Sequence, residues 1–222
     1  MARARYDGVT DWYEAWAHGA GREFLERTRA LAAALLPAGE GMLVDAGCGT
    51  GLGAPTWTAL GWRAVGVDVS ADQVRIAQAR MPVLRARAEQ LPFADASAGA
   101  ACSLLTHTDI EDFAGCVREL ARVVRPGGPV VYVGVHPCFV GNFVEPRDDG
   151  TLVGHRGYRR IGWSDPPAFV PEGVRTRVGA HHLTLERLLG AFVQPPLRLQ
   201  EVREDPVGPF PELLGVSAVR EG

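Results

Sequence analysis

A glycine-rich segment near residue 45 limits most strongly what this chain can fold into. Residues 42–46 are mostly apolar and lead into Gly47, Gly49 and Gly51, a pattern typical of a buried strand that turns tightly into a helix. Glycine tolerates positive φ and lets a ligand approach bare backbone. A second apolar segment ends at Asp68, 19 residues after Gly49. That spacing suits an acid that binds ribose hydroxyls in a βαβ nucleotide site, so the sequence predicts a site for an adenosine-containing ligand.

Length and composition exclude several classes of protein. The 222 residues suit one domain, and the 46% hydrophobic and 22% charged fractions are ordinary for a soluble globule. The net charge of −3 and the absence of a Lys/Arg run argue against a nucleic-acid partner. No apolar run approaches the ~20 residues that cross a bilayer, so we expect no membrane partner and a cytoplasmic location. The four cysteines form no CxxC or CxxH pattern, and we expect buried thiols with no bound metal.

Apolar runs alternate with helical patterns along most of the chain. Strands are expected at 42–46, 63–68, 83–87, 99–105, 130–135, 197–203 and 212–220. Three- and four-residue periodicity predicts helix over 7–36, and Ser70 and Thr108 begin capping-box patterns that should start two later helices. This alternation predicts an α/β fold with a doubly wound, mostly parallel seven-stranded sheet and flanking helices.

The domain organisation follows from the same pattern. We expect a single domain with an N-terminal helical cap (1–37), a ligand-binding core (41–135), an insertion (136–182) and a closing helix with strands (183–222). The insertion is rich in Gly, Pro, Arg, His and aromatic residues and shows no sustained period. Long irregular segments within compact domains are usually lids or binding loops, so we expect this one to be a lid.

The glycine spacing separates two classes of nucleotide site. The dinucleotide fingerprint G-x-G-x-x-G places a pyrophosphate on a helix N-terminus. Here the glycines alternate at 47, 49, 51 and 53, and Asp45 precedes them. An acid at this place would repel a pyrophosphate and suits a cationic amine. The pattern therefore argues against a nicotinamide-dependent oxidoreductase.

Five segments carry a resemblance to a known family. They are 44–51, 65–70, 88–93, 105–107 and 120–128. With an opening at 6–13 that is similar to the family's N-terminal cap, the chain resembles the class I S-adenosylmethionine-dependent methyltransferases of the small-molecule branch over roughly residues 5–135. The resemblance implies a Rossmann-like fold, S-adenosyl-L-methionine as cofactor and S-adenosyl-L-homocysteine as product. It implies methyl transfer to an O, N or C atom of a small organic acceptor, such as an aromatic, secondary-metabolite or quinone-like compound. We expect a monomer or a homodimer, and the sequence does not separate the two.

The resemblance also implies which residues bind the cofactor. The matching positions are Tyr6, Tyr13, Asp45, Ala46, Gly47, Cys48, Gly49, Gly51, Asp68, Val69, Ala88, Glu89 and Leu105. Asp68 would accept hydrogen bonds from both ribose hydroxyls, Asp45 would face the ligand's positive end, and the Leu105 carbonyl would lie near the sulfonium. Arg87 departs from the family pattern. Many relatives carry an aspartate at this position, which accepts a hydrogen bond from the adenine amine, whereas arginine cannot accept one.

Methyl transfer from a sulfonium is an in-line displacement, in which the protein mainly aligns the reactants and excludes water. A general base is needed only when the acceptor must lose a proton, and histidine is the usual one. His107 and His136 follow the fourth and fifth strands, at the sheet edge where such folds bind ligands. We therefore expect them to be catalytic, with loop shaping as the alternative role. The expected acceptor contacts are Phe139, Tyr158, Trp163 and His182.

Three other functions remain open from the sequence. A protein of this fold could bind the same cofactor and catalyse a cyclisation or rearrangement without methyl transfer. A nucleotide-binding oxidoreductase is disfavoured by the glycine spacing, and a non-catalytic adapter by the intact glycine loop.

Overall fold

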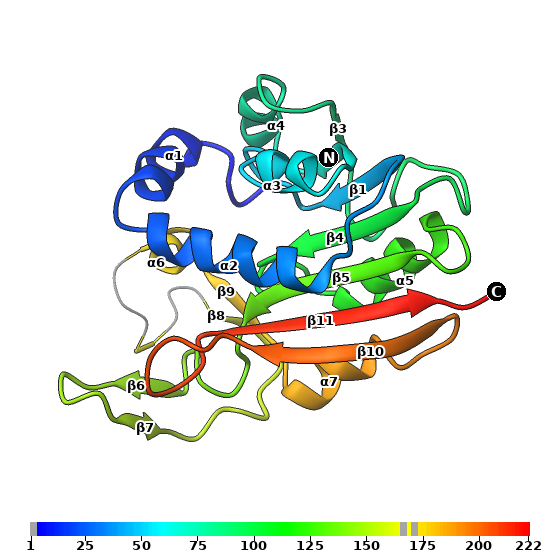
Figure 1. The fold of residues 1–222 in the computed structure, drawn as a ribbon. Coiled ribbons are helices and arrows are strands. Elements are labelled where there is room, and N and C mark those ends of the chain that lie inside the picture. Colours follow the sequence, from blue (N-terminus) through cyan, green and yellow to red (C-terminus); the bar gives the residue numbers. More distant parts are fainter. Residues whose placement is uncertain (1–3, 165–167, 170–172) are drawn as a thin grey trace.

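A seven-stranded sheet forms the centre of the computed structural model, which describes residues 4–164, 168–169 and 173–222 (Figure 1). The strand order is β10-β11-β5-β4-β1-β2-β3. The strands are β1 (Met42–Ala46), β2 (Arg63–Asp68), β3 (Val83–Arg85), β4 (Ala100–Leu104), β5 (Pro129–Val135), β10 (Leu197–Glu204) and β11 (Leu213–Arg220). Strands β1 to β5 pair in parallel, whereas β11 runs antiparallel to both of its neighbours. The predicted mostly parallel α/β sheet is confirmed.

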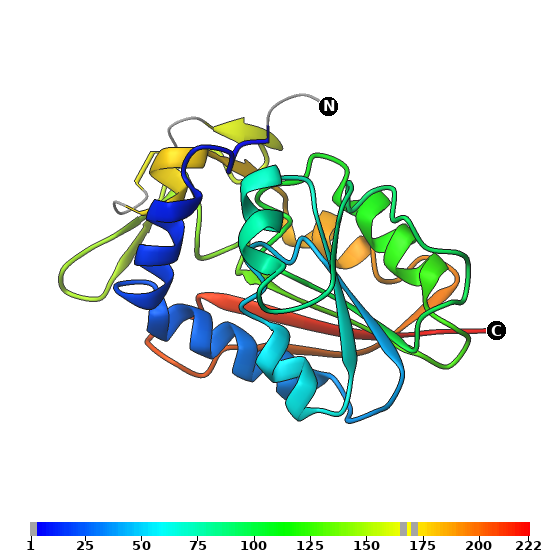
Figure 2. The same ribbon diagram turned by 90° about the horizontal axis from the view of Figure 1, so that it is seen from above.

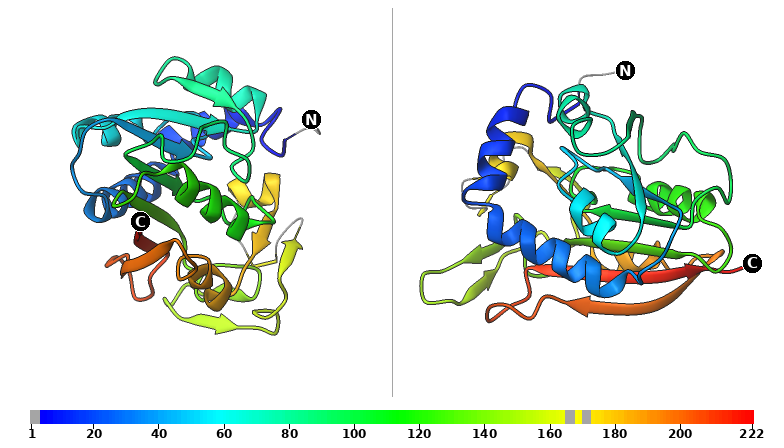
Figure 3. Two further views of the ribbon diagram at one scale, coloured as in Figure 1. Left: turned by 90° about the vertical axis from the view of Figure 1, so that its right-hand side faces the viewer. Right: turned by 45° about the horizontal axis from the view of Figure 1, so that its top comes forward.

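Helices cover both faces of the sheet (Figures 2 and 3). They are α1 (Thr10–His18), α2 (Arg22–Leu35), α3 (Ala54–Ala59), α4 (Ala71–Ala77), α5 (Phe113–Val123), α6 (Val174–Val178) and α7 (Leu185–Gly190). Side chains alternate across a strand, so β5 feeds two cores. Val131 and Val133 pack with α2 and α3, whereas Val130 and Tyr132 pack with α5 and α7. None of the helices in the described ranges is long and apolar enough to span a bilayer.

The N-terminal cap consists of two helices, not the single helix that periodicity predicted over 7–36. Helix α1 ends at His18 and α2 begins at Arg22. The turn between the two helices contains Gly21. A Cβ at this position would lie 2.6 Å from the Trp16 ring, so only glycine fits there. Glycines also weaken a helix interior, which explains why the periodic pattern breaks here.

The two predicted helix starts have different outcomes. Ser70 caps α4 as predicted, with its hydroxyl accepting from the Gln73 amide at 3.2 Å. The prediction for Thr108 was wrong, because its hydroxyl donates to the Leu105 carbonyl at 3.0 Å. Helix α5 instead begins after Asp112, whose carboxylate accepts from the Gly115 amide at 2.8 Å.

The insertion contains more regular structure than its irregular sequence predicted. Strand β6 (Val144–Pro146) pairs with β7 (Leu152–Gly154), and these two project beyond the end of the main sheet in Figure 1. Strand β8 (Gly162–Ser164) pairs with β9 (Ala180–His182). Three-residue strands are too short to show a period in the sequence.

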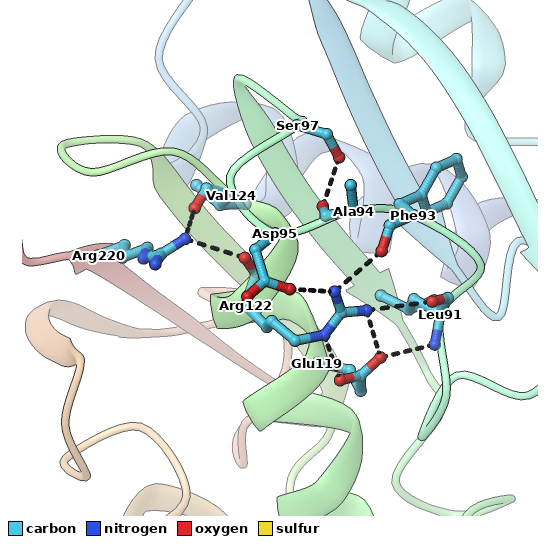
Figure 4. A network of polar contacts seen from close by, with 9 residues as sticks. All are labelled: Leu91, Phe93, Ala94, Asp95, Ser97, Glu119, Arg122, Val124 and Arg220. Atoms are coloured by element: carbon cyan, nitrogen blue, oxygen red, sulfur yellow. Dashed lines mark hydrogen bonds and ion pairs between the residues drawn. The ribbon is translucent and has the colours of Figure 1, made fainter.

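A polar network fixes the loop that follows β3 (Figure 4). The Arg122 guanidinium on α5 pairs with Glu119 and Asp95, each at 2.6 Å, and donates to the carbonyls of Phe93 and Leu91. The Leu91 amide donates back to Glu119 at 2.7 Å. Hydrogen bonds to Arg122 lower the Glu119 pKa, so the carboxylate is held ionised. The network thus anchors the loop that begins with residues 88 and 89.

Candidate cofactor and acceptor site

A cavity of about 470 Å³ lies at the carboxyl ends of β1, β2, β4 and β5. Its wall combines the glycine loop after β1, the loops after β2 and β4, the two N-terminal helices and part of the insertion. Ligands of open α/β sheets bind at this edge. The sheet thus places the sequence-predicted nucleotide motif in a cavity.

Asp68 is held in the cavity wall by two backbone amides. Gly49 N donates to Oδ2 and Ser70 N donates to Oδ1, both at 2.9 Å. Gly49 has φ +56°, a left-handed conformation that glycine adopts without strain. Burial raises the Asp68 pKa to about 6, so the carboxylate is ionised at neutral pH. Each carboxylate oxygen keeps acceptor capacity for a ligand hydroxyl.

Asp45 is a second buried carboxylate in the wall. Trp57 Nε1 donates to its Oδ2 at 2.8 Å, and burial raises its pKa to about 6. The adjacent Gly47 has φ +73°, and a Cβ there would lie 2.3 Å from the Thr106 side chain. Glycine is therefore required for the close packing of this loop against the end of β4.

The wall beyond Asp68 is formed by Val69, Ala88 and Glu89. Arg87 also lines the cavity, and its guanidinium donates to Glu89 Oε1 at 2.5 Å. Arg87 therefore forms an ion pair with Glu89. It occupies the position at which the family pattern has an aspartate that accepts a hydrogen bond.

Most residues that the resemblance assigned to the cofactor line this cavity. The exceptions are Ala46 and Gly51. Ala46 is buried at the end of β1, and its carbonyl accepts from Ser103 Oγ at 2.7 Å. Gly51 faces α4, where a Cβ would lie 3.4 Å from Ala77.

A partly buried ion pair that the sequence did not reveal also lies in the wall. Arg175 Nη1 on α6 donates to Asp109 Oδ1 at 2.6 Å, and Nη2 donates to the Leu105 carbonyl at 3.5 Å. Leu105 has φ +60°, an uncommon and strained conformation for a residue with a side chain. Tyr6 and Tyr13 line the same cavity, with ring centroids 5.8 Å apart, and burial raises the Tyr13 pKa to about 12.

The two histidines expected to be catalytic lie outside the cavity wall. His107 is 2% exposed, its Nδ1 pairs with the Tyr132 hydroxyl, and burial lowers its pKa to about 3. His136 accepts from the Cys138 amide at Nδ1 (3.1 Å), so Nε2 donates to Glu204 (3.0 Å). Both rings are occupied by structural partners, and their positions do not support a general-base role.

The expected acceptor contacts also lie outside the wall and pack the insertion instead. His182 Nε2 bonds the Tyr158 carbonyl at 2.7 Å, and the Tyr158 hydroxyl accepts from the Leu185 amide at 2.9 Å. Trp163 donates to Glu111 at 2.7 Å, and Phe139 packs against the rings of His136 and Phe210. The insertion does reach the cavity, through Val140, Gly173, Val174 and Arg175.

The residues present fit a ligand with a ribose and a cationic amine. Two carboxylates, Asp45 and Asp68, face one cavity beside left-handed glycines. Gln73 Oε1 is buried in the same wall and has no hydrogen-bond partner among the described residues. Buried amide oxygens normally have a partner, which here a ligand amine would supply. Within the described ranges, no group of three or more His, Cys, Asp or Glu residues could hold a metal ion.

Sequence comparison places the core of the chain in a known family. Residues 44–132 match the family model described as a methyltransferase domain. A malonyl-[acyl-carrier protein] O-methyltransferase of Serratia marcescens is 33% identical over 93 residues, which cover 40% of this chain and 36% of that protein. The O-methyltransferase cnsE of Penicillium expansum is 31% identical over 124 residues, 50% of this chain and 45% of that protein. The matches thus span less than half the length of these curated relatives.

Solved structures match over most of the chain. An S-adenosylmethionine-dependent methyltransferase from Mesorhizobium loti superposes with a TM-score of 0.69 at 25% identity, covering 86% of this chain and 96% of that one. A second, putative one from Listeria monocytogenes gives a TM-score of 0.71 at 15% identity, covering 89% and 98%. Together with the glycine loop and Asp68 in one cavity, these matches identify residues 44–132 as a methyltransferase domain and show that the chain is similar to the S-adenosylmethionine-dependent methyltransferases, which indicates S-adenosyl-L-methionine as the cofactor.

Proposed function

We propose that this chain transfers a methyl group from S-adenosyl-L-methionine to an O, N or C atom of a small organic acceptor that enters the same cavity. The observation that carries the proposal is the Asp68 carboxylate, fixed by the Gly49 and Ser70 amides in the cavity wall. When bound, the cofactor supplies a methyl group that is already activated as part of a sulfonium.

The cofactor half of the cavity recognises three chemical groups. Asp68 would accept hydrogen bonds from the ribose hydroxyls, and Val69 and the backbone of residues 88 and 89 would border the adenine. Asp45 and the Gln73 amide oxygen would face the cationic methionine end. A carboxylate near a cation is favoured in a buried site, because little water screens the attraction.

The N-terminal cap is linked to the glycine loop that lines the cavity. Arg80, in the turn after α4, donates to both carboxylate oxygens of Glu14 on α1, at 2.6 and 3.0 Å. Arg80 also donates to the Thr50 carbonyl of the glycine loop at 2.8 Å. This connection holds the cap beside the loop at one side of the cavity.

The groups in the wall favour an acceptor that needs little help with deprotonation. No histidine lines the cavity in the described part of the chain. Tyr6 and Tyr13 are neutral at pH 7, because burial raises the pKa of both phenols. Alignment of a nucleophile that already has a free lone pair is therefore the main contribution of the protein. The names of the two curated relatives support oxygen as the methylated atom.

The test is incubation of the intact chain with methyl-labelled S-adenosylmethionine and a panel of small carboxylic acids, phenols and amines, followed by mass spectrometry. The expected product carries one added methylene and the label. An isomerised product with no mass gain would contradict the proposal and favour a cyclisation or rearrangement. Asp148→Ala, in the exposed loop between β6 and β7, is a matched control for Asp68→Ala, which should abolish most of the turnover at limiting cofactor.

A further inference from the structure

The loop after β3 forms the end of the cavity that lies beyond Asp68. In the sheet order, β2 lies between β1 and β3. A ligand that starts at the glycine loop after β1 and passes Asp68 at the end of β2 therefore reaches residues 87–89, which follow β3 and line the same cavity. With a ribose bound at Asp68, the part of the ligand that meets this loop is the base.

Glu89 supplies the carboxylate at this end of the cavity. The other carboxylates in the wall come from elsewhere in the sheet: Asp45 from β1, Asp68 from β2, Asp109 from the loop after β4 and Glu212 from the β10–β11 connection. Among the described residues that line the cavity, Glu89 is therefore the one carboxylate on the β3 side.

Arg87 binds one oxygen of this carboxylate. Its guanidinium donates to Glu89 Oε1 at 2.5 Å, and the arginine side chain is 58% exposed whereas that of Glu89 is 15% exposed. Glu89 Oε2 has no hydrogen-bond partner within the described ranges. The arginine therefore holds the carboxylate from the solvent side and leaves its second oxygen for a ligand donor.

An unpaired donor lies next to this acceptor. Ala88 is 7% exposed and lines the cavity, and its backbone amide has no hydrogen-bond partner within the described ranges. Buried backbone amides normally have a partner, which here a ligand would supply. Adenine has the complementary edge, a 6-amine donor beside the N1 acceptor, whereas hypoxanthine, with a 6-oxo group and a protonated N1, has the reverse.

We propose that Glu89 selects the base of the cofactor by accepting a hydrogen bond from the adenine 6-amine, and that Arg87 is the positioning residue that orients its carboxylate. The inference rests on the proposed function, because it assigns the part of the same cavity that recognises the cofactor. A 6-oxo group would face the carboxylate without a proton between them, and an unpaired buried acceptor is the basis of strong discrimination against an analogue. The ion pair also accounts for an arginine at position 87, because the acceptor lies further along the loop.

The test compares S-adenosylhomocysteine with S-inosylhomocysteine, which carries a 6-oxo group in place of the 6-amine. Both affinities are measured by calorimetry on the intact chain. S-adenosylhomocysteine should bind about tenfold or more tightly, as expected for a hydrogen bond to a charged group. Glu89→Gln should bring the two affinities within about threefold of each other, because the uncharged amide can accept from the amine or donate to the oxo group.

Glu201→Gln is the matched control. Glu201 pairs with Arg203 at 2.5 Å, with the same spacing in the chain as the Glu89 pair, but it lies on β10 outside the cavity wall. This variant should keep the preference for adenine. Arg87→Met should reduce the preference about two- to fivefold, the range for an exposed ion pair, and Arg87→Lys should restore it. A merely structural role of the arginine would change both affinities equally and leave their ratio unchanged.

Three results would overturn the inference: equal binding of the two compounds by the original chain, a preference for the inosine compound, or a preference for adenine that survives Glu89→Gln. Binding of neither compound by the original chain would contradict the proposed function itself, which separates the two failures. If Glu89→Gln loses its cooperative thermal unfolding, Arg87→Met decides, and an unchanged preference in that variant would overturn the inference as well.

Discussion

The Arg175 guanidinium on α6 lies 2.6 Å from the Asp109 carboxylate in the loop after β4, and the pair joins the insertion to the edge of the main sheet. Both side chains are largely buried, with exposures of 18% and 22%. Arg175 also bonds the carbonyl of the strained Leu105. The pair therefore closes one side of the cavity between segments that are 66 residues apart.

Arg175→Gln should loosen the insertion. Removing one partner of this partly buried pair leaves the other polar group unsatisfied, at a cost of about 1–3 kcal/mol, so trypsin should cut after the exposed Arg156, Arg159 or Arg160 about tenfold faster. S-adenosylhomocysteine should slow the cleavage of the original chain. Arg118→Gln removes an exposed arginine on α5 and serves as the control. Equal cleavage of Arg175→Gln and the original chain would show that the pair does not hold the insertion.

Asp68→Ala should weaken the binding of S-adenosylhomocysteine. The carboxylate is the acceptor proposed for the ribose hydroxyls, and a hydrogen bond to a charged group is worth roughly 1.5–3 kcal/mol. Calorimetry should show this loss, whereas Asp148→Ala should bind like the original chain. An unchanged affinity in Asp68→Ala would remove this residue from the cofactor site.

The affinity for S-adenosylhomocysteine should fall in acid. Burial raises the Asp68 pKa to about 6, so the acceptor form is present above that value and is lost as the pH falls through it. Between about pH 7 and about pH 5 the protonation of Asp68 should lower the affinity roughly tenfold. Burial raises the Asp45 pKa to about 6 as well, so Asp45 should add a second factor of similar size. Asp68→Asn should remove the first factor and Asp45→Asn the second. A flat profile for the original chain would contradict this assignment.

His107→Ala should reduce stability and spare the chemistry. The substitution leaves a cavity and deprives the buried Tyr132 hydroxyl of its partner, which together should cost about 2–4 kcal/mol of unfolding free energy in urea. Turnover per folded molecule should stay within about twofold of the original, because general-base help is worth ~10²–10⁴ and none is expected to be lost. A hundredfold loss of turnover with unchanged stability would restore the catalytic role that the sequence suggested.

Local sequence patterns predicted the cofactor side of the molecule well. The glycine loop and Asp68 occupy one βαβ unit, so their spacing alone brings them together, as the 2.9 Å bond from Gly49 to Asp68 shows. The role of Ser70 as the N-cap of α4 was predictable for the same reason, because a capping residue and its helix are adjacent in the chain. The predicted helix start at Thr108 was wrong because Asp112 lies closer to the apolar stripe of α5 and caps that helix instead.

The acceptor side depends on contacts that no local pattern contains. Arg175 reaches Asp109 only because α6 folds back over the end of β4. His107 was placed correctly at the end of the fourth strand, but Tyr132 on the neighbouring strand holds its ring in the core. The direction in which a side chain leaves a loop is decided by such tertiary partners, so sequence position alone could not separate a core histidine from a catalytic one.

The most direct test of the cofactor site is a parallel calorimetric titration of the intact chain with S-adenosylhomocysteine and with NAD. One equivalent of S-adenosylhomocysteine should bind per chain, and NAD should give no saturable heat, because Asp45 beside the glycine loop repels a pyrophosphate. Saturable binding of NAD without any binding of S-adenosylhomocysteine would contradict the assignment of this cavity.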